Sequence, residues 1–126
     1  MNETLLRWLS KADGDYNTAK RELAVIENPN YDSVFFHSQQ CVEKLFKALL
    51  IHNSQTPPKI HDLLELYRIM IEFYPDIRIN EHRLTRLSLG AVNYRYPYEE
   101  ANEDDATEAF ETCRSIREII LPLFNS

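Results

Sequence analysis

The spacing of apolar residues near the start of this chain constrains its fold more than any other feature. Apolar and aromatic side chains recur there at alternating intervals of four and three residues, at Leu5, Leu9, Ala12, Tyr16, Ala19, Leu23 and Ile26. Because an α-helix completes a turn about every 3.6 residues, this spacing places all of them on one face. We therefore expect one long amphipathic helix over residues 3–26, whose apolar face must be covered by other elements.

The rest of the chain has the pattern of further helices joined by short connections. The sequence contains only two glycines, and its prolines fall at expected joints or in the last turn, which disfavours a β fold with its many turns. Further helices are expected at about 32–52, from Leu63 to near Pro75, from Asn80 to before Pro97, and from Asn102 to near Phe124. Long helices with short joints favour antiparallel neighbours. We therefore predict an all-α, up-and-down bundle of four main helices and one shorter helix.

Polar residues at the expected helix starts support these boundaries. Asp32 or Ser33 can cap the second helix, because their side-chain oxygens can accept free backbone N–H groups of the first turn. Asn80 and Asn102 can cap the fourth and fifth helices in the same way. The acidic run over 99–111 coincides with the start of the fifth helix, where the helix dipole favours carboxylates.

Length, cysteine content and net charge narrow the class of protein. A chain of 126 residues suits one domain over 1–126. Cys41 and Cys113 fall on helical patterns rather than in a CxxC pair, so we expect buried thiols in a reducing compartment. The sequence shows no secretory leader and no apolar run near the roughly 18 residues of a membrane span, which predicts a cytoplasmic protein. The net charge of −6 disfavours a protein that coats nucleic acid through its overall charge.

The sequence lacks the motifs of common cofactor enzymes. Gly14 and Gly90 are too far apart to form a phosphate-binding loop. The Glu-x-x-His pairs of di-iron bundles do not occur, and no serine or cysteine lies in a recognisable triad context. We therefore expect no cofactor, no metal site and no catalytic residue of these kinds.

The helix expected at 32–52 carries an amide on its apolar face. On a helical wheel, Gln39 falls within about 40° of Phe35, among apolar side chains, and Glu43 lies at the edge of the same arc. The side chains expected on the opposite, charged side are His37, Gln40, Lys44 and Lys47. A buried amide without partners would cost roughly 1–3 kcal/mol. Gln39 is therefore expected to be paired with a tyrosine or a backbone carbonyl, to contact a ligand, or to set the register of a contact with the region around Arg95 or with a second subunit.

Three segments, taken in order, resemble the HEPN family, the "higher eukaryotes and prokaryotes nucleotide-binding" domain. They are FHSQQCVEKLFKALL at 36–50, IHDLLEL at 60–66, and NYRYPYE at 93–99 before an acidic final helix. The resemblance covers essentially the whole chain and implies a bundle of four to five helices, often a homodimer. It also implies a gene beside, or fused to, a minimal nucleotidyltransferase in a toxin–antitoxin or defence pair.

Many HEPN proteins are metal-independent ribonucleases, and the resemblance aligns the arginine of their active site with Arg95. In those proteins a histidine follows the arginine four to six residues later, but here the next residues are Tyr-Pro-Tyr-Glu-Glu-Ala-Asn. RNA cleavage through the 2′-hydroxyl needs a group with a pKa of about 7 to move the proton, and neither tyrosine nor glutamate ordinarily has one. His82 follows Arg78 by four positions, but this pair falls in the joint before the fourth helix. We therefore expect binding rather than catalysis.

Six residues are candidates for ligand binding or for an interface: Gln39, Glu43, His61, Tyr94, Arg95 and Tyr96. In the nucleotide-binding interpretation, Arg95 binds a phosphate and the two tyrosines stack on a base. Gln39 and Glu43 then read the edge of that base from the facing helix.

Each candidate also has a purely structural interpretation. Arg95 can pair with Glu99 or Glu100, and His61 can simply mark a helix start. The tyrosines at 94, 96 and 98 can equally line a dimer interface.

Three functions therefore remain open. The first is a non-catalytic, homodimeric HEPN domain that binds a nucleotide, a minimal nucleotidyltransferase partner, or both. The second is a divergent HEPN ribonuclease that uses Arg95. The third is a helical protein-interaction adaptor without nucleotide binding. Nucleic acid is a less expected ligand for this acidic chain, and no membrane contact is expected.

Overall fold

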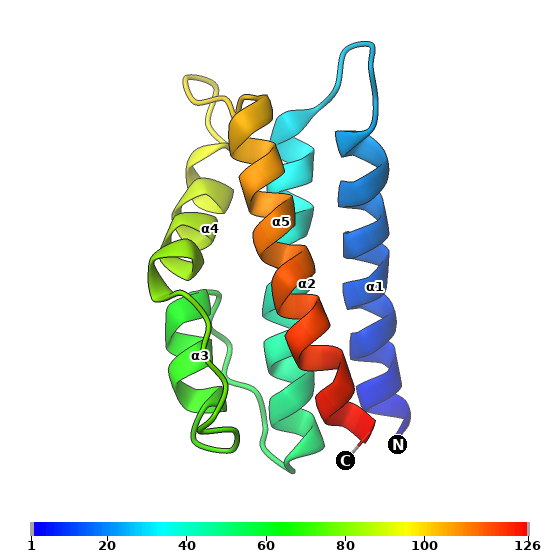
Figure 1. Cartoon of the computed structure of the whole chain (residues 1–126), viewed down its shortest axis with the longest axis vertical. Helices are drawn as coiled ribbons and strands as arrows, with labels where there is room; N and C mark the ends of the chain where they lie inside the picture. The colour runs from blue at the N-terminus through cyan, green and yellow to red at the C-terminus, as the bar shows by residue number, and fades with distance from the viewer. Residues whose placement is uncertain (1, 126) are drawn as a thin grey trace.

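The computed structural model describes residues 2–125, which form an all-α bundle. Its helices are α1 (Glu3–Leu23), α2 (Tyr31–His52), α3 (Leu63–Met70), α4 (Glu81–Asn93), α5 (Glu103–Ile120) and the 3-10 helix η1 (Leu121–Asn125). The helices α1, α2 and α5 run along the length of the molecule, and α3 and α4 follow one another along one side (Figure 1). The predicted bundle is confirmed, with α3 as its shorter helix.

The central element is α2, because α1, α3, α4 and α5 all pack against it. Its buried apolar side chains, among them Phe46 and Leu49, form the middle of the core. Cys41 of α2 and Cys113 of α5 are both buried, which confirms the prediction of buried thiols. The neighbouring Cys41 thiol, followed by burial, raises the pKa of Cys113 well above its ordinary value.

The side of α2 that was expected to face solvent is instead covered by α1. The carboxylate of Asp15 on α1 accepts a hydrogen bond from Lys44, and it lies 2.8 Å from Nδ1 of His37. His37 and Lys44 are half-buried, and Lys47 is buried, with its ammonium group 6.0 Å from the ring centroid of Trp8. The expectation that His37, Lys44 and Lys47 face solvent was wrong. A helical wheel with a single apolar stripe does not describe a helix that packs against other helices on several sides.

The predicted caps of α4 and α5 are confirmed. Asn80 accepts the backbone N–H of Arg83 at 3.1 Å. Asn102 accepts that of Asp105 at 2.8 Å, and the Asp105 carboxylate accepts the backbone N–H of Asn102 in return. Both caps satisfy donors that an α-helix leaves free in its first turn.

The predicted cap of α2 was wrong. Asn30, rather than Asp32 or Ser33, caps this helix by accepting the backbone N–H of Ser33 at 3.0 Å. Asp32 accepts the backbone N–H of Ala101 at 2.7 Å and so ties the start of α2 to the connection before α5. The sequence offers three neighbouring polar side chains here, and a partner far along the chain decides which of them is the cap.

Two helices are shorter than their apolar pattern predicts. The first ends at Leu23, and Ile26 lies exposed in the loop that leads to α2. The third ends at Met70, and residues 71–80 form turns before α4. Because the following helix begins soon after, the chain must turn back before the apolar pattern ends. Within residues 2–125, no helix combines the length and apolarity needed to cross a bilayer.

Candidate functional site

Two neighbouring hollows lie along α2 and α4, at the end of the bundle where Arg95 follows α4. The larger, here called the amide hollow, has a volume of about 460 Å³ and is lined by Phe36, Gln39, Gln40, His61, Asp62, Ser88, Leu89, Ala91, Val92 and Arg95. The other, here called the tyrosine hollow, has a volume of about 410 Å³ and is lined by Asn30, Asp32, Ser33, Phe36, Ala91, Tyr94 and Arg95. The two hollows therefore share Phe36, Ala91 and Arg95.

Arg95 lies where the two hollows meet. Its guanidinium carbon is 5.4 Å from the ring centroid of Phe36, so the charged group lies against the aromatic ring. Within the described residues no carboxylate forms an ion pair with Arg95, those of Glu99 and Glu100 included. The guanidinium thus keeps its hydrogen-bonding capacity for another partner.

Gln39 is only 3% exposed, and its amide is fully engaged. Its Nε2 donates to Oε1 of Glu43 at 3.0 Å and, over 3.4 Å, to the backbone carbonyl of His61. Its Oε1 accepts from Nε2 of Gln40 at 2.7 Å. A backbone carbonyl is thus one of the partners, as expected, but the main one is a carboxylate and no tyrosine takes part.

Glu43 connects the wall of the amide hollow to the core. Its carboxylate is hydrogen-bonded to the buried Lys47 at 3.3 Å, and both side chains are 7% exposed. The same carboxylate lies 3.1 and 3.2 Å from Nδ1 of His61. Because a carboxylate only accepts hydrogen bonds, this arrangement places a proton on Nδ1 and leaves Nε2 on the opposite edge of the ring. The carboxylate therefore fixes the orientation of a His61 side chain that is otherwise 81% exposed.

Tyr94 is a half-buried residue whose ring packs edge-on against Phe35, with centroids 5.0 Å apart. Burial, followed by the charge and hydrogen bonding of Asp105, raises the pKa of Tyr94. The phenol is therefore protonated at neutral pH, and Tyr94 offers the tyrosine hollow an aromatic ring rather than a base.

The structure brings together some of the residues that the sequence singled out. Gln39, His61 and Arg95 all line the amide hollow, and Glu43 is the hydrogen-bonding partner of Gln39 and His61. Tyr94 shares only the tyrosine hollow with Arg95. Tyr96 is exposed, lies outside both sets of lining residues, and is the one candidate that the structure keeps apart from the others.

Sequence reasoning missed Phe36 and Gln40. Phe36 is the ring on which Arg95 lies, and Gln40 is the donor to Gln39. The available signal was their spacing, since residues four apart on a helix face the same way. That signal was hidden because Gln40 was assigned to the solvent side of α2.

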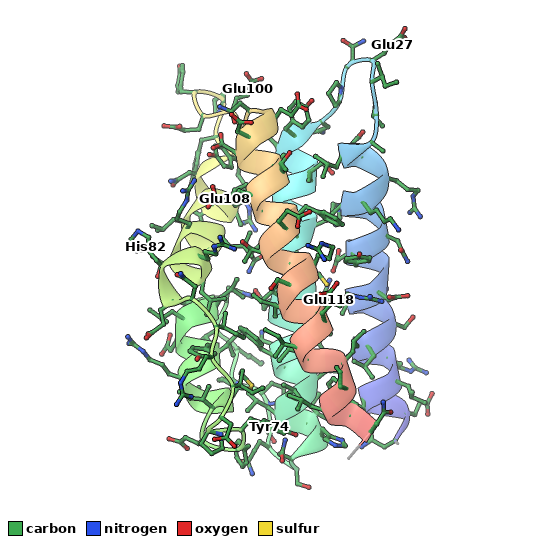
Figure 2. All side chains as sticks on the ribbon, viewed as in Figure 1. Glu27, Tyr74, His82, Glu100, Glu108 and Glu118 are labelled. Carbon is green, nitrogen blue, oxygen red and sulfur yellow. The ribbon has the colours of Figure 1, made fainter. Side chains whose placement is uncertain are left out.

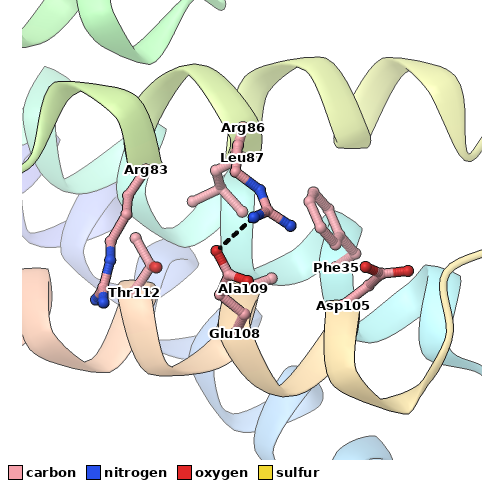
Figure 3. A pocket seen from close by; sticks show the side chains of 8 residues that line it. All are labelled: Phe35, Arg83, Arg86, Leu87, Asp105, Glu108, Ala109 and Thr112. Carbon is pink, nitrogen blue, oxygen red and sulfur yellow. Dashed lines mark ion pairs between the residues drawn. The ribbon is translucent and has the colours of Figure 1, made fainter.

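The other basic residues near Arg95 in sequence face elsewhere. Arg83 and Arg86 point toward α5 across a gap of only about 10 Å³, where Arg86 pairs with Glu108 at 3.2 Å (Figure 3). His82 projects at the edge of the molecule beside α4 (Figure 2) and does not line either hollow. The fold thus separates Arg83 and Arg86, which face α5, from Arg95, which lines the two hollows. Among the described residues that line the two hollows, Arg95 is the one lysine or arginine.

A metal site is not evident from the side chains. Within residues 2–125, no three histidine, cysteine, aspartate or glutamate side chains gather closely enough to hold an ion. The two hollows offer hydrogen-bonding groups from amides, an imidazole, serine hydroxyls and the carboxylates of Asp32 and Asp62, together with one guanidinium and the ring of Tyr94.

Comparison with known proteins identifies the family. The family model described as the HEPN domain matches residues 5–123. The chain belongs to the HEPN domain family. A crystal structure of an archaeal HEPN homologue superposes on this HEPN domain with a TM-score of 0.67 and 20% identity, covering 98% of this chain and 99% of the other. At that identity the likeness concerns the fold alone. A search of curated proteins finds no match to this chain.

Proposed function

We propose that this HEPN domain is a non-catalytic, homodimeric module that binds a nucleotide in the amide hollow. One observation carries the proposal. Gln39 on α2, His61 before α3 and Arg95 after α4 line the same hollow although they are far apart in sequence. A hollow of about 460 Å³ is within the range of small-ligand sites, about 300–1,000 Å³.

The groups around the amide hollow suit the parts of a nucleotide. A guanidinium binds phosphate oxygens through paired, charge-assisted hydrogen bonds, which is the role proposed for Arg95. The amide of Gln40 and Nε2 of His61 offer a donor and an acceptor to a base edge. Gln39 and Glu43 hold these two side chains in place.

The non-catalytic part of the proposal rests on the residues after Arg95. No histidine follows at the spacing found in HEPN ribonucleases, and the pKa of the neighbouring Tyr94 is raised, which removes it further from the range of a general base.

His61 is the observation that favours a second candidate, a divergent HEPN ribonuclease. Its oriented imidazole lines the same hollow as Arg95 and can in principle move a proton. Incubation with labelled single-stranded RNA tests this candidate. We expect no cleavage, and cleavage by the parent protein that is lost in both Arg95→Ala and His61→Ala would make the ribonuclease the better assignment.

Exposed apolar side chains in the wall of the amide hollow and on the connection after α4 support the homodimer. Leu89 and Val92 on α4 are 59% and 52% exposed, and Tyr96 and Tyr98 are exposed on the connection that follows. Apolar and aromatic residues of this kind are typical of protein interfaces. The minimal nucleotidyltransferase partner and the toxin–antitoxin or defence pairing are proposed from family membership alone.

Calorimetric titration tests the nucleotide site directly. We expect Arg95→Ala to lower the affinity for AMP by about tenfold or more, because a charge-assisted phosphate contact is lost. Arg7→Ala is the matched control, since it removes the same charge from an exposed position at the start of α1. The absence of any heat with the parent protein would favour the adaptor interpretation.

Native mass spectrometry of the protein purified from its own cells tests the assembly. We expect a dimer that carries either a nucleotide mass or a partner of nucleotidyltransferase size. A bare monomer would contradict the homodimer.

A further inference from the structure

We propose that this domain carries a second ligand site, which binds a single phosphate group in a hollow between the start of α4 and α5. This hollow, here called the arginine hollow, has a polar lining of Arg78, Asn80, Arg83, Thr112 and Ser115, and isoleucine side chains complete its wall. It shares no residue with the amide hollow or the tyrosine hollow. The inference therefore does not depend on the proposed nucleotide site.

The two guanidinium groups of the arginine hollow have no counter-charge. Within residues 2–125, no carboxylate forms an ion pair with Arg78 or Arg83. Arg78 donates to the backbone carbonyls of Pro75 and Ile77, which hold the side chain in place without neutralising it. By contrast, Arg86 lies one turn further along α4 and pairs with a carboxylate of α5 at 3.2 Å. Two unpaired guanidiniums on one hollow favour an anionic ligand, since anions bind them through charge-assisted hydrogen bonds.

The position of these arginines opposes the dipole of α4. The helix begins at Glu81, and a helix N-terminus favours negative charge. Arg83 lies in this first turn and Arg78 lies just before it. Glu81 itself pairs with Arg68 at 3.1 Å and does not line the hollow. An anion in the hollow would neutralise both guanidiniums and satisfy the helix N-terminus at the same time.

Thr112 provides an independent indication of a ligand. Its side chain is only 5% exposed and lines the arginine hollow. Its hydroxyl has no hydrogen-bond partner in the part of the chain that the structure describes. Figure 3 shows Thr112 on α5 beside Arg83, which reaches toward it from α4. Because an unpaired buried hydroxyl destabilises a fold, its retention here is explained by an acceptor that enters the hollow with the ligand.

Charge and size both favour a phosphate group as this ligand. A phosphate monoester carries a charge of about −1.5 to −2 at neutral pH, which matches two guanidiniums. Its oxygens can accept hydrogen bonds from Arg78, Arg83 and the hydroxyl of Thr112. The hollow has a volume of about 90 Å³, below the range of about 300–1,000 Å³ for small-ligand sites, so it suits one such group rather than a whole nucleotide. Inorganic phosphate and a small phosphomonoester share this chemistry.

Calorimetric titration with inorganic phosphate and with methyl phosphate, at constant ionic strength, tests the site. We expect both Arg83→Gln and Thr112→Val to weaken phosphate binding by about tenfold or more, because each loses a hydrogen bond to a charged group. Arg7→Gln is the matched control, since it removes one charge from an exposed position on α1, and it should retain the parent affinity. Equal affinity of Arg83→Gln and Arg7→Gln for phosphate would overturn the proposal.

Thermal unfolding of Thr112→Val separates a ligand-binding hydroxyl from a structural one. Without phosphate, we expect the variant to unfold at a higher temperature than the parent protein, because a methyl group of similar shape replaces an unpaired hydroxyl. Phosphate at roughly ten times its dissociation constant should raise the midpoint of the parent protein by about 4 °C or more, and that of the variant by much less. A lower midpoint for the variant with an unchanged response to phosphate would contradict the proposal.

Amide chemical-shift mapping distinguishes this site from the proposed nucleotide site. We expect phosphate to shift the resonances of Arg83 and Thr112. Shifts confined to residues around Arg95 would overturn the second site and leave the nucleotide proposal intact, whereas phosphate binding at Arg83 without any nucleotide binding would overturn only the latter. The two probes identify the source of the phosphate. Tighter binding of methyl phosphate supports a small phosphomonoester as the ligand, and tighter binding of inorganic phosphate supports the free ion.

Discussion

Gln39 places a polar amide inside the apolar packing of α2, and its partners explain why the position is stable. Its donors and acceptor are engaged by Glu43, His61 and Gln40. The helical wheel identified Gln39 and Glu43 as unusual because their positions on the apolar face follow from residue spacing along one helix alone. The same spacing pairs Glu43 with Lys47, four residues later on α2. It could not identify the carbonyl of His61 as part of the network, because that contact depends on how the connection before α3 packs on α2.

Replacement of Gln39 by leucine tests whether the amide is structural. We expect Gln39→Leu to lower the free energy of unfolding by about 1–2 kcal/mol, because the His61 carbonyl and the Gln40 amide lose a buried partner. Asn17→Leu, at an exposed position of α1, is the control and should change stability by about 0.5 kcal/mol or less. Urea denaturation measures both, and a gain in stability for Gln39→Leu would show that the amide is incidental to the fold.

The buried pair of Glu43 and Lys47 makes a stronger prediction. Glu43→Gln leaves the Lys47 ammonium buried without a counter-charge, so we expect a loss of about 3–5 kcal/mol in unfolding free energy. Adding Lys47→Met removes the unpaired charge and should restore most of that loss. If the double variant is no more stable than Glu43→Gln alone, the pair is not what stabilises this part of α2.

At the scale of elements, the contact between α2 and α4 depends on a glycine. A Cβ atom at Gly90 would lie 2.3 Å from Cζ of Phe35. Phe35 is buried and packs edge-on against Tyr94, so the ring has little room to move away. The close approach of α2 and α4 at this point places Phe36 and Arg95 on the same side of the bundle.

The two glycines of the chain are expected to respond to alanine in opposite ways. Gly90→Ala should destabilise the protein by about 1–3 kcal/mol through overpacking against Phe35. Gly14→Ala should stabilise it by about 0.5–1 kcal/mol, because alanine favours the helix and, beyond the backbone of its own helix, no atom lies within 4 Å of the new methyl group. Chemical denaturation of both variants gives the comparison. A neutral Gly90→Ala would mean that Phe35 moves aside at little cost.

Local sequence predicted the existence of the helices better than their ends. Asn80 and Asn102 were identified as caps because each is a good N-cap residue directly before the expected helix. At the start of α2 three candidates lie close together, and the bond from Ala101 to Asp32 leaves Asn30 as the cap. Ile26 continues the apolar pattern of α1 but lies beyond the helix, because the chain has already turned toward α2.

At the scale of the whole molecule, the order of three sequence segments was enough to identify the family. The sequence did not show which of the neighbouring arginines would face α5 and which would line the hollows. Arg83, Arg86 and Arg95 are close in sequence, but α4 turns the first two toward α5 and ends before the third. Only the position of α4 opposite α5 distinguishes an arginine paired with Glu108 from one that lines a hollow.

The raised pKa values predict weaker stability in alkaline solution. Tyr94 has a pKa above its ordinary 10.0 in the folded protein, so its contribution to stability is complete below about pH 10 and is lost as the pH rises through the folded-state value. Tyr31, raised by burial and Glu103, and the buried Cys113 act in the same direction. Unfolding free energies at about pH 8 and about pH 11 should therefore differ less in Tyr94→Phe than in the parent protein. Tyr98→Phe, at an exposed position, is the control, and an equal difference in all three proteins would contradict this account.

The start of α1 and the end of η1 lie at the same end of the bundle, opposite the end where α1 connects to α2 and where Arg95 follows α4 (Figure 1). A polypeptide joined to either end therefore extends away from the two hollows. This arrangement makes the bundle suitable for insertion into a surface loop of a carrier protein, since both junctions would leave from one side. A biosensor built in that way would keep the ligand-facing end open to solution without any redesign of the helices.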